Sequence, residues 1–470
     1  MGPGPRWVRL FVCVGVAGIL WGLPSPEGLP REGWQTFAVF AGVISAFLLR
    51  PIAMAPAVLL GLIVLVLAGT VDAGDAIAEG FGDKTVWLVV AAFLVAGAVD
   101  RTGLGRRIAL HLIRILGRSM LGLGYAIAAT ELALGPFIPS NTARGGGIIS
   151  PVVWSVARTL GAVPDTPTAR TGAFLAQTGS HANLVCSAMF LTAMAGNPLV
   201  AVEAERIFGV DWSFASWLLG SIVPGLAGLA AVPLVMYLLQ PPDSHDVSRV
   251  RARVRDEIEA LGPWTRRELT LVAILLALLA LWSTKSFHGI DTTVIAFMGI
   301  LAIVLTDTQE WRDIAATWGA WDALIWLGGF VALAEALIAT GFTTWLQDVI
   351  GGHLSGFSPV ATTIAIGLIY FATMLFFSQL TAHITALAAV FLTLAASASS
   401  PPFLAVAIIS YFSCLCGTMT PWSSGPVIIY FGFGYVSVGR WMINGCSMAV
   451  VQIAIWLGLG LGWWKLLEWW

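Results

Sequence analysis

Charged side chains are scarce in this sequence. Asp, Glu, Lys and Arg make up 11% of its 470 residues, whereas about a quarter of an ordinary soluble domain is charged. Apolar residues make up 58%, and they form runs of roughly 15 to 20 residues, the length that crosses the hydrocarbon core of a bilayer. Because too few polar residues are present to cover a surface in water, we expect the chain to fold in a membrane.

Several motifs of catalysis and binding are missing. The formal net charge is −2, which leaves no basic stripe for a nucleic acid, and no phosphate-binding loop, HExxH motif or pair of CxxC motifs occurs. The five cysteines lie in apolar stretches and are interpreted as small buried side chains, and the six histidines are too widely spaced to predict a metal site. We therefore predict no metal, no organic cofactor, no nucleic-acid partner and no enzymatic activity.

Eleven apolar segments are predicted to span the membrane. They lie near 8–23, 34–49, 52–70, 85–100, 171–196, 212–239, 269–285, 291–307, 322–340, 402–431 and 441–467. Two further apolar stretches, 120–160 and 359–399, are interrupted by polar residues, and a broken helix facing lipid would leave backbone groups without hydrogen bonds. We expect these two stretches to be re-entrant hairpins buried in protein. The predicted fold is an all-α polytopic membrane protein with eleven transmembrane helices and two hairpins.

Basic residues mark one side of the membrane. An arginine-rich polar segment, 240–268, divides the chain, and further arginines stand at the ends of predicted spans, namely Arg6, Arg9, Arg50, Arg312 and Arg440. The loops between these arginines carry few basic residues, and cytoplasmic loops are the ones enriched in Lys and Arg. The pattern predicts a multi-pass inner-membrane protein with a cytoplasmic N-terminus.

The two halves of the chain resemble each other. The stretch around Gly103 parallels the stretch around Gly341, and the same displacement places the two polar interruptions opposite each other. Arginines are frequent before the first hairpin, whereas no Lys or Arg occurs between Arg312 and Arg440, so the equivalent segments are expected on opposite membrane faces. This combination predicts an inverted repeat whose broken segments build a site near the bilayer midplane.

The first hairpin contains a polar triplet, Ser140-Asn141-Thr142, between Pro139 and Arg144. Proline ends one half-helix, and the amides that open the next half-helix, together with the triplet side chains, form a cradle for a carboxylate at the positive end of a helix dipole. Hydroxyl groups that bond back onto their own helix are the alternative. An unpaired arginine in a bilayer is costly, so a functional role is predicted for Arg144.

The second hairpin has a similar polar tip. It reads Ser378-Gln379-Leu380-Thr381-Ala382-His383, and after one extra residue Thr381 and His383 fall opposite Thr142 and Arg144. Two facing carboxylate cradles suit a molecule with a carboxylate at each end, so a small dicarboxylate is the hypothesised substrate. For His383, a neutral histidine hydrogen-bonded in the core is the alternative to a charged one.

The tips resemble those of the divalent anion/sodium symporter family, whose members carry Ser-Asn-Thr at each of two hairpin tips. The resemblance covers essentially the whole chain. Within that family, the first tip with its glycines, the stretch from Ser187 to Pro198 and the ending from Gly425 to Tyr435 are similar to the branch of 2-oxoglutarate/malate and citrate or tartrate/succinate translocators.

This resemblance implies a homodimer in which a transport domain moves against a scaffold as an elevator. Scaffold helices are expected in 1–119 and 269–358, a cytoplasmic linker in 240–268, and the hairpins with the transport-domain helices in 120–239 and 359–470. The resemblance also implies that substrate is bound by Ser140, Asn141, Thr142, Ser378 and Thr381. Unwound segments at 179–183 and 418–421 would complete the site with Asn183, Thr420 and Pro421.

Two departures from the family pattern bear on coupling. The second tip lacks the expected asparagine, and Arg144 and His383 stand where sodium-coupled members carry small or hydroxyl residues. Because a fixed positive charge hinders the return of an empty carrier, we predict exchange of small dicarboxylates, with Arg144 and His383 among the substrate-binding residues. Sodium-coupled symport, with sodium as the coupling ion, is the alternative, and a channel or a membrane enzyme is a further one.

Overall fold

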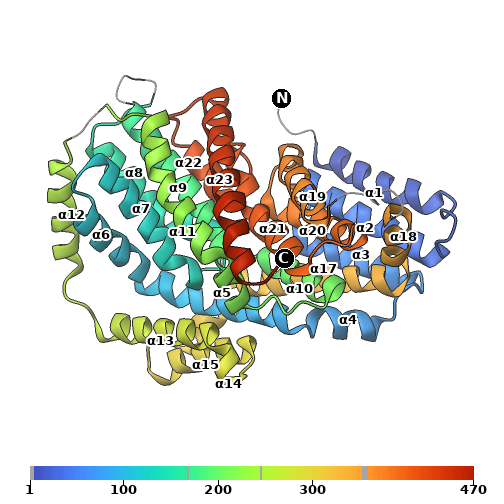
Figure 1. Ribbon diagram of the computed structural model, residues 1–470. Coiled ribbons are helices and arrows are strands. Elements are labelled where there is room, and N and C mark those ends of the chain that lie inside the picture. Colours follow the sequence, from blue (N-terminus) through green and yellow to red (C-terminus); the bar gives the residue numbers. More distant parts are fainter. Residues whose placement is uncertain (1–4, 165, 167–168, 244–245, 352–357) are drawn as a thin grey trace.

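The computed structural model describes residues 5–164, 166, 169–243, 246–351 and 358–470. Within these residues every regular element is a helix. Eight helices, two of them counted together with the 3₁₀ turn that follows, are at least 18 residues long and are apolar enough to cross a membrane by length and composition, and shorter apolar helices accompany them. The all-helical polytopic fold predicted from the sequence is confirmed (Figure 1).

The helices fall into two series joined by α12 (Ser248–Leu261). The first series is α1 (Arg6–Gly22), α2 (Arg31–Leu49), α3 (Met54–Leu67), α4 (Ala73–Phe81), α5 (Lys84–Thr102), α6 (Leu104–Leu116), α7 (Met120–Leu134), η1 (Gly135–Phe137), η2 (Thr142–Ile149), α8 (Ser150–Thr159), α9 (Ala169–Met189), η3 (Leu191–Ala193), α10 (Asn197–Phe208) and α11 (Phe214–Leu239). The second series is α13 (Arg266–Ser283), α14 (Lys285–His288), α15 (Thr292–Leu305), α16 (Trp311–Ala315), α17 (Trp318–Ala339), α18 (Phe342–Gly351), α19 (Pro359–Thr373), η4 (Met374–Phe376), α20 (Leu380–Ser397), α21 (Pro402–Leu415), η5 (Cys416–Thr418), α22 (Gly425–Phe431) and α23 (Val438–Leu466).

The two series repeat each other. Helices α3 and α15 each have 14 residues, and α7 and α19 each have 15 residues followed by a single 3₁₀ turn. Gly103 after α5 and Gly341 after α17 both adopt left-handed backbone, with φ of 70° and 80°, a conformation that glycine adopts at no steric cost. The internal repeat predicted from these two glycines is confirmed.

A helix lies in each of the eleven predicted spans, with one correction inside a span. The predicted unwinding at 179–183 is wrong, because α9 is continuous from Ala169 to Met189 and the chain leaves the helix only after it. Gly179 serves close packing instead, since a Cβ there would lie 2.6 Å from the ring of Tyr430. The predicted break at 418–421 is confirmed, between η5 and α22.

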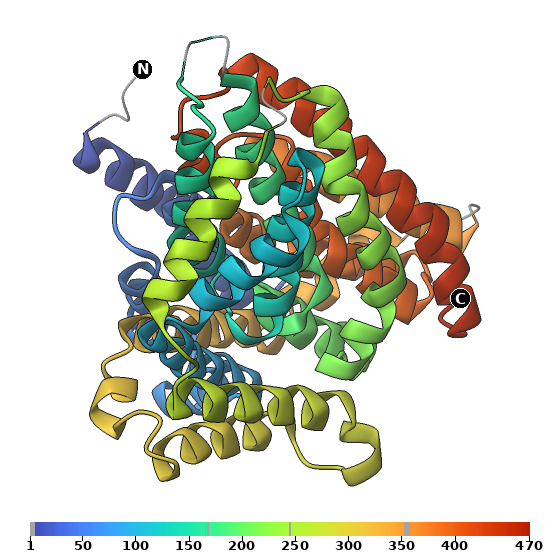
Figure 2. The ribbon, with the colours of Figure 1, turned by 90° about the vertical axis from the view of Figure 1, so that its left-hand side faces the viewer.

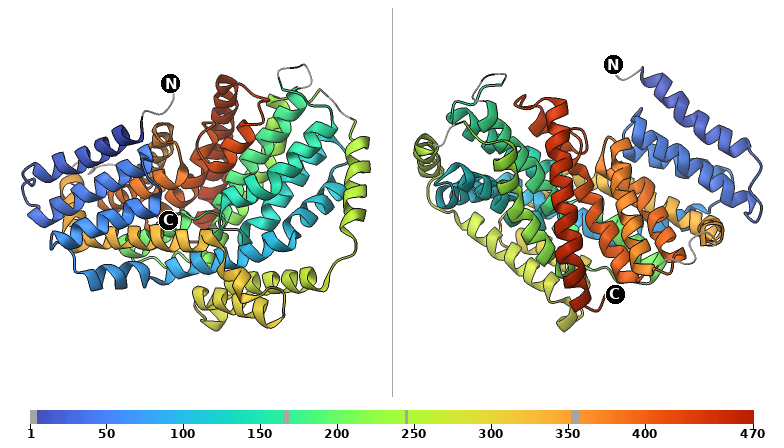
Figure 3. Two further views of the ribbon diagram at one scale, coloured as in Figure 1. Left: turned by 180° about the vertical axis from the view of Figure 1, so that it is seen from behind. Right: turned by 45° about the horizontal axis from the view of Figure 1, so that its top comes forward.

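Two groups of helices form the molecule. In one group α17 packs against α3, α4 and α5, and α15 packs between α5 and α13. In the other, α9 packs against α7, α8, α11, α21 and α22. The first group runs from side to side in Figure 1, whereas α7, α9, α11 and α23 run steeply across that direction, as the views of Figure 3 also show. Helix α9 therefore stands between the first hairpin and the second repeat.

The linker between the halves is held by a buried arginine. Helix α12 lies along α6 (Figure 2), and the Nε of Arg107 on α6 donates to Glu268 Oε1 on α13 over 2.7 Å. The other guanidinium nitrogens of Arg107 donate to the carbonyls of Gly262 and Leu261 over 2.8 and 3.0 Å. Both side chains of the ion pair are buried. The segment 240–268 thus fastens the first repeat to the start of the second.

Replacing Gly80 by alanine is expected to destabilise the packing of α4 against α17. A Cβ on Gly80 would lie 2.3 Å from the carbonyl oxygen of Gly328, so the helices must separate, at a cost of about 1–3 kcal/mol. Thermal unfolding in detergent measures the loss as a lower Tm. Gly15→Ala is the matched control, because nothing lies within 4 Å of a Cβ at that position. Equal Tm values for the two variants would contradict this packing.

Candidate functional site

The first hairpin breaks at its polar triplet. Helix α7 and η1 end in an extended stretch at Ile138, and the chain then enters the π-helix η2, which leads into α8. The Oγ of Ser140 accepts a hydrogen bond from the backbone N–H of Ala143 over 3.1 Å, which caps the new helix. Asn141 is buried, whereas Thr142 is exposed. The predicted re-entrant geometry of this tip is what the structure has.

The second hairpin breaks in the same way between η4 and α20. Because α7 ends at Leu134 and α19 ends at Thr373, the extra residue precedes the tip, and Gln379 rather than Ser378 stands in the place of Ser140. Ser378 is exposed and Thr381 is half-buried. The guanidinium of Arg50, at the end of α2, contacts the side-chain oxygen of Gln379. A cation from the first repeat therefore lies at this tip.

Both tips dock on one short segment at the start of α22. A Cβ on Gly425 would lie 2.2 Å from Thr142 Oγ1, so the first tip rests directly on this glycine. The backbone N–H of Leu380 at the second tip donates to the carbonyl of Ser423 over 2.8 Å. Two residues of extended chain span at most about 7 Å. The two tips therefore approach each other through the stretch from Ser423 to Gly425.

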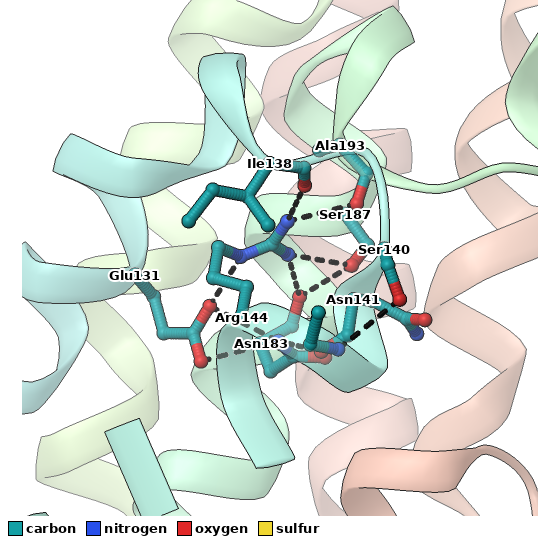
Figure 4. A network of polar contacts seen from close by, with 9 residues as sticks. Glu131, Ile138, Ser140, Asn141, Arg144, Asn183, Ser187 and Ala193 are labelled. Carbon is teal, nitrogen blue, oxygen red and sulfur yellow. Dashed lines mark hydrogen bonds and ion pairs between the residues drawn. The ribbon is translucent and has the colours of Figure 1, made fainter. Parts of the chain in front are cut away.

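Arg144 is fully buried, and its side chain is surrounded by protein acceptors (Figure 4). Its Nε donates to Glu131 Oε2 over 2.7 Å. Its terminal nitrogens donate to four more acceptors, which are the carbonyls of Ile138 (2.9 Å), Ala193 (2.8 Å) and Asn183 (3.5 Å) and the hydroxyl of Ser187 (3.0 Å). A guanidinium has five N–H donors. Each of them has an acceptor within the protein, so none faces a substrate in this structure.

The charge of Arg144 is also neutralised. Glu131 lies on α7 with a side chain that is 0% exposed, as is that of Arg144. Asn183 adds two hydrogen bonds from its amide nitrogen to the two Glu131 oxygens, over 3.1 and 3.0 Å. The uncompensated positive charge that the sequence predicted for Arg144 is therefore not what the structure has, because Glu131 is its partner.

The His383 ring is buried between the two arms of the second hairpin. The ring is 0% exposed, and its Nε2 is 2.9 Å from Thr373 Oγ1 and 3.2 Å from the carbonyl oxygen of Tyr370. Its Nδ1 lies 4.0 Å from the Cys416 sulfur. These contacts correspond to the histidine hydrogen-bonded within the core, which was the alternative interpretation of the sequence.

Several buried polar atoms around the first tip and the shared segment have no hydrogen-bond partner among the described residues. They are Asn141 Nδ2, Asn183 Oδ1, Thr420 Oγ1, Ser424 Oγ and Tyr430 OH. Pro421 is buried beside Thr420. An unsatisfied buried polar group costs about 1–3 kcal/mol, so these atoms are sites at which a polar ligand gains hydrogen bonds. Asn183 and Thr420, predicted from the sequence, belong to this set.

Sequence reasoning missed two residues of this region, Glu131 and Tyr430. A signal was present for Glu131, because an acidic residue in the otherwise apolar first arm is the natural partner of an intramembrane arginine. For Tyr430 no such signal exists, since its proximity depends on how α22 packs against α9 and η2.

The site has no cluster of metal ligands. Among the described residues, no group of three or more His, Cys, Asp or Glu side chains is placed to hold a metal ion. Cys13, Cys186, Cys414 and Cys416 are buried free thiols, and Cys446 is exposed. The arrangement is that of a binding site lined by hydroxyl, amide and backbone groups.

An internal helical repeat with two broken hairpins that meet on one segment, in a chain with apolar helices long enough to span a membrane, points to a polytopic membrane transporter. The family model for the transmembrane region of sodium:sulfate symporters matches residues 5–470. The chain belongs to this family, as the resemblance to the divalent anion/sodium symporters predicted.

Relatives of known name match along nearly the whole chain. It is 39% identical over 466 residues to a Bacillus subtilis protein named as a malate transporter, covering 99% of this chain and 97% of that protein. It is 34% identical over 457 residues to dicarboxylate transporter 1 of spinach chloroplasts, covering 96% of this chain and 80% of that protein. It is 30% identical over 482 residues to the L-tartrate/succinate antiporter of Escherichia coli, covering 98% of this chain and 99% of that protein.

Two solved structures share the fold at low sequence identity. The YdaH transporter of Alcanivorax borkumensis superposes with a TM-score of 0.61 at 15% identity, covering 99% of each chain. MtrF of Neisseria gonorrhoeae superposes with a TM-score of 0.56 at 13% identity, covering 97% of this chain and 93% of that one. At these identities the likeness concerns the fold alone.

Replacing Glu131 by glutamine is expected to destabilise the protein strongly. The variant leaves the Arg144 guanidinium buried without a counter-charge, and breaking a buried ion pair from one side costs about 3–5 kcal/mol. Thermal unfolding in detergent and the yield of folded protein measure this loss. Glu205→Gln is the control, because its ion pair with Lys84 is exposed and such pairs contribute little. Similar Tm values for the two variants would refute the importance of the buried pair.

Proposed function

We propose that the chain is a secondary carrier that exchanges small dicarboxylates across the inner membrane. The observation that carries the proposal is the meeting of two hairpin tips, one from each repeat, on the segment from Ser423 to Gly425. Each tip opens a new helix, where free amides and the helix dipole favour a carboxylate. A substrate with two carboxylates joined by a short carbon chain fits between two such tips.

The binding residues follow from this arrangement. Ser140, Asn141 and Thr142 would hold one carboxylate, and Ser378 and Thr381 the other. Asn183, Thr420 and Pro421 would line the wall between the tips. The unpartnered buried atoms of Asn141, Asn183 and Thr420 support this assignment, as does the cationic side chain of Arg50 at the second tip, because a dianion needs positive potential along its entry.

The names of the relatives support both the substrate class and the exchange mode. They include a malate transporter, a chloroplast dicarboxylate transporter and a tartrate/succinate antiporter. Malate, tartrate and succinate are four-carbon dicarboxylates, and an antiporter requires substrate on both sides of the membrane. Since Glu131 neutralises Arg144, the exchange mode rests on these relatives and no longer on a free charge at Arg144.

Sodium-coupled symport is the second mode, because the family model is named for sodium:sulfate symporters. Backbone carbonyls at the broken segments would hold a sodium ion in that mode. In either mode we propose a homodimer in which 120–239 and 359–470 move as an elevator against 1–119 and 269–358, with the N-terminus in the cytoplasm. The arginine-rich linker 240–268 would then lie on the cytoplasmic side.

Transport in proteoliposomes tests the mode directly. Vesicles loaded with unlabelled malate are expected to take up radiolabelled malate rapidly, whereas empty vesicles take up little with or without an inward sodium gradient. Strong sodium-driven uptake into empty vesicles would replace exchange by symport. Absence of counterflow under all conditions would remove carrier function altogether, since a channel or an enzyme gives no acceleration by internal substrate.

Replacing Asn141 by alanine is expected to weaken substrate binding. The Asn141 amide nitrogen is buried without a partner, and loss of a hydrogen bond to a charged group costs about 1.5–3 kcal/mol, or roughly tenfold to over a hundredfold in affinity. The KM for malate in counterflow measures the effect. Thr159→Ala is the control, because Thr159 bonds only back to Ser155 at the far end of the same hairpin. An unchanged KM for the Asn141 variant would remove this residue from the site.

A further inference from the structure

The two hairpins carry buried polar contacts at equivalent positions. Helices α7 and α19 end at Leu134 and Thr373, and helices α9 and α21 end at Met189 and Leu415. Two positions are equivalent when they lie the same number of residues from the corresponding helix end in each repeat. Three pairs of polar residues are equivalent in this sense, which are Glu131 with Tyr370, Arg144 with His383, and Ser187 with Ser413.

In the first repeat the three positions are joined by charged hydrogen bonds. Arg144, on the second arm of the hairpin, donates to Glu131 on the first arm over 2.7 Å and to Ser187 on α9 over 3.0 Å. The same guanidinium donates to Ile138, just before the tip, and to Ala193, just after α9. One side chain thus ties both arms, the break of the hairpin and the following helix together.

In the second repeat the equivalent positions are joined by neutral contacts. His383, on the second arm, lies with Nε2 3.2 Å from the carbonyl oxygen of Tyr370 on the first arm, and the two rings are 4.5 Å apart. The Tyr370 hydroxyl lies 2.8 Å from Ser413 Oγ on α21. All three side chains are buried. The same three structural elements are therefore joined, with the tyrosine rather than the histidine reaching the following helix.

We propose that Glu131–Arg144–Ser187 and Tyr370–His383–Ser413 are equivalent clamps that fix each hairpin tip to the helix behind it. The proposal rests on the proposed function, because the purpose of the clamps is to hold the tips at the spacing of a dicarboxylate. Arg144 and His383 are then positioning residues and not substrate ligands. Arg144 stands three residues after Asn141, so its contact with Ser187 on α9 sets where the first tip presents its donors.

The physical difference between the clamps gives them different rigidity. Hydrogen bonds between ionised groups are roughly twice as strong as neutral ones, and a fully satisfied buried network specifies one arrangement. The first clamp has a guanidinium with five protein acceptors. The second has a histidine and a tyrosine in neutral contacts. The first tip is therefore held more firmly than the second.

Mild substitutions test the positioning role without unfolding the protein. Ser187→Ala and Tyr370→Phe each remove one clamp hydrogen bond and should raise the KM for malate exchange by about three- to tenfold, with little change in maximal rate. Ser221→Ala is the matched control, because Ser221 is equally buried and its hydroxyl donates to the Met189 carbonyl on α9, outside the clamp. KM values for both clamp variants that match the Ser221 control would overturn the proposal.

Transplanting the second clamp into the first tests their equivalence. The single variants Glu131→Tyr and Arg144→His each leave a buried ionisable group without its partner and should lose exchange. The double variant combines tyrosine and histidine at the positions where the second hairpin has them, with Ser187 available to the tyrosine hydroxyl. It is expected to exchange malate at least about tenfold faster than either single variant, because the two changes couple.

A double variant no more active than the single ones would overturn the equivalence of the clamps. Failure of the proposed function is a separate result, in which wild-type vesicles show no malate counterflow at all. If wild-type protein exchanges malate and the Ser187 and Tyr370 variants keep the wild-type KM, only the clamp inference falls.

Discussion

The buried pair of Arg144 and Glu131 is the constraint on which the first hairpin depends. Two charges that are removed from water are tolerated only when they are paired and when their remaining hydrogen bonds are satisfied. Both conditions are met, because Glu131 also receives the Asn183 amide and Arg144 reaches four further acceptors, which lie on α9, on η3 and at the break of the hairpin. Gly145 of the π-helix and the continuous α9 serve this network, since a Cβ on Gly145 would lie 2.5 Å from the Asn183 amide nitrogen.

This pairing separates two roles that an intramembrane arginine is able to take. A free guanidinium in a binding site attracts an anion and changes the free-energy cost of moving the empty site across the membrane. A guanidinium that is paired and has all its hydrogen bonds made within the protein instead holds the surrounding backbone in place. Arg144 belongs to the second kind in this structure. The groups left for a substrate are neutral donors and helix-terminal amides, together with Arg50, which reaches the second tip from the other repeat.

The repeat explains why a site with two similar ends arises from one chain. Each half supplies a broken hairpin, a following helix and a second break, and the start of α22 receives both tips at Ser423 and Gly425. The halves differ in chemistry, because the first uses an ion pair where the second uses Tyr370 and His383. A carrier with one firm and one softer tip would hold one carboxylate in a fixed place and adapt around the other.

The sequence by itself determined the membrane environment, the spans, the repeat and the two polar tips, because hydrophobic run length, the Gly103 and Gly341 turns and the clustered hydroxyls are local properties. The family resemblance predicted that the chain would unwind at 179–183, where Gly179 instead admits the Tyr430 ring. It also left Arg144 without its partner. Only the tertiary structure decided these points, since packing between distant helices determines whether a glycine is a break or a contact, and whether a buried charge is free or paired.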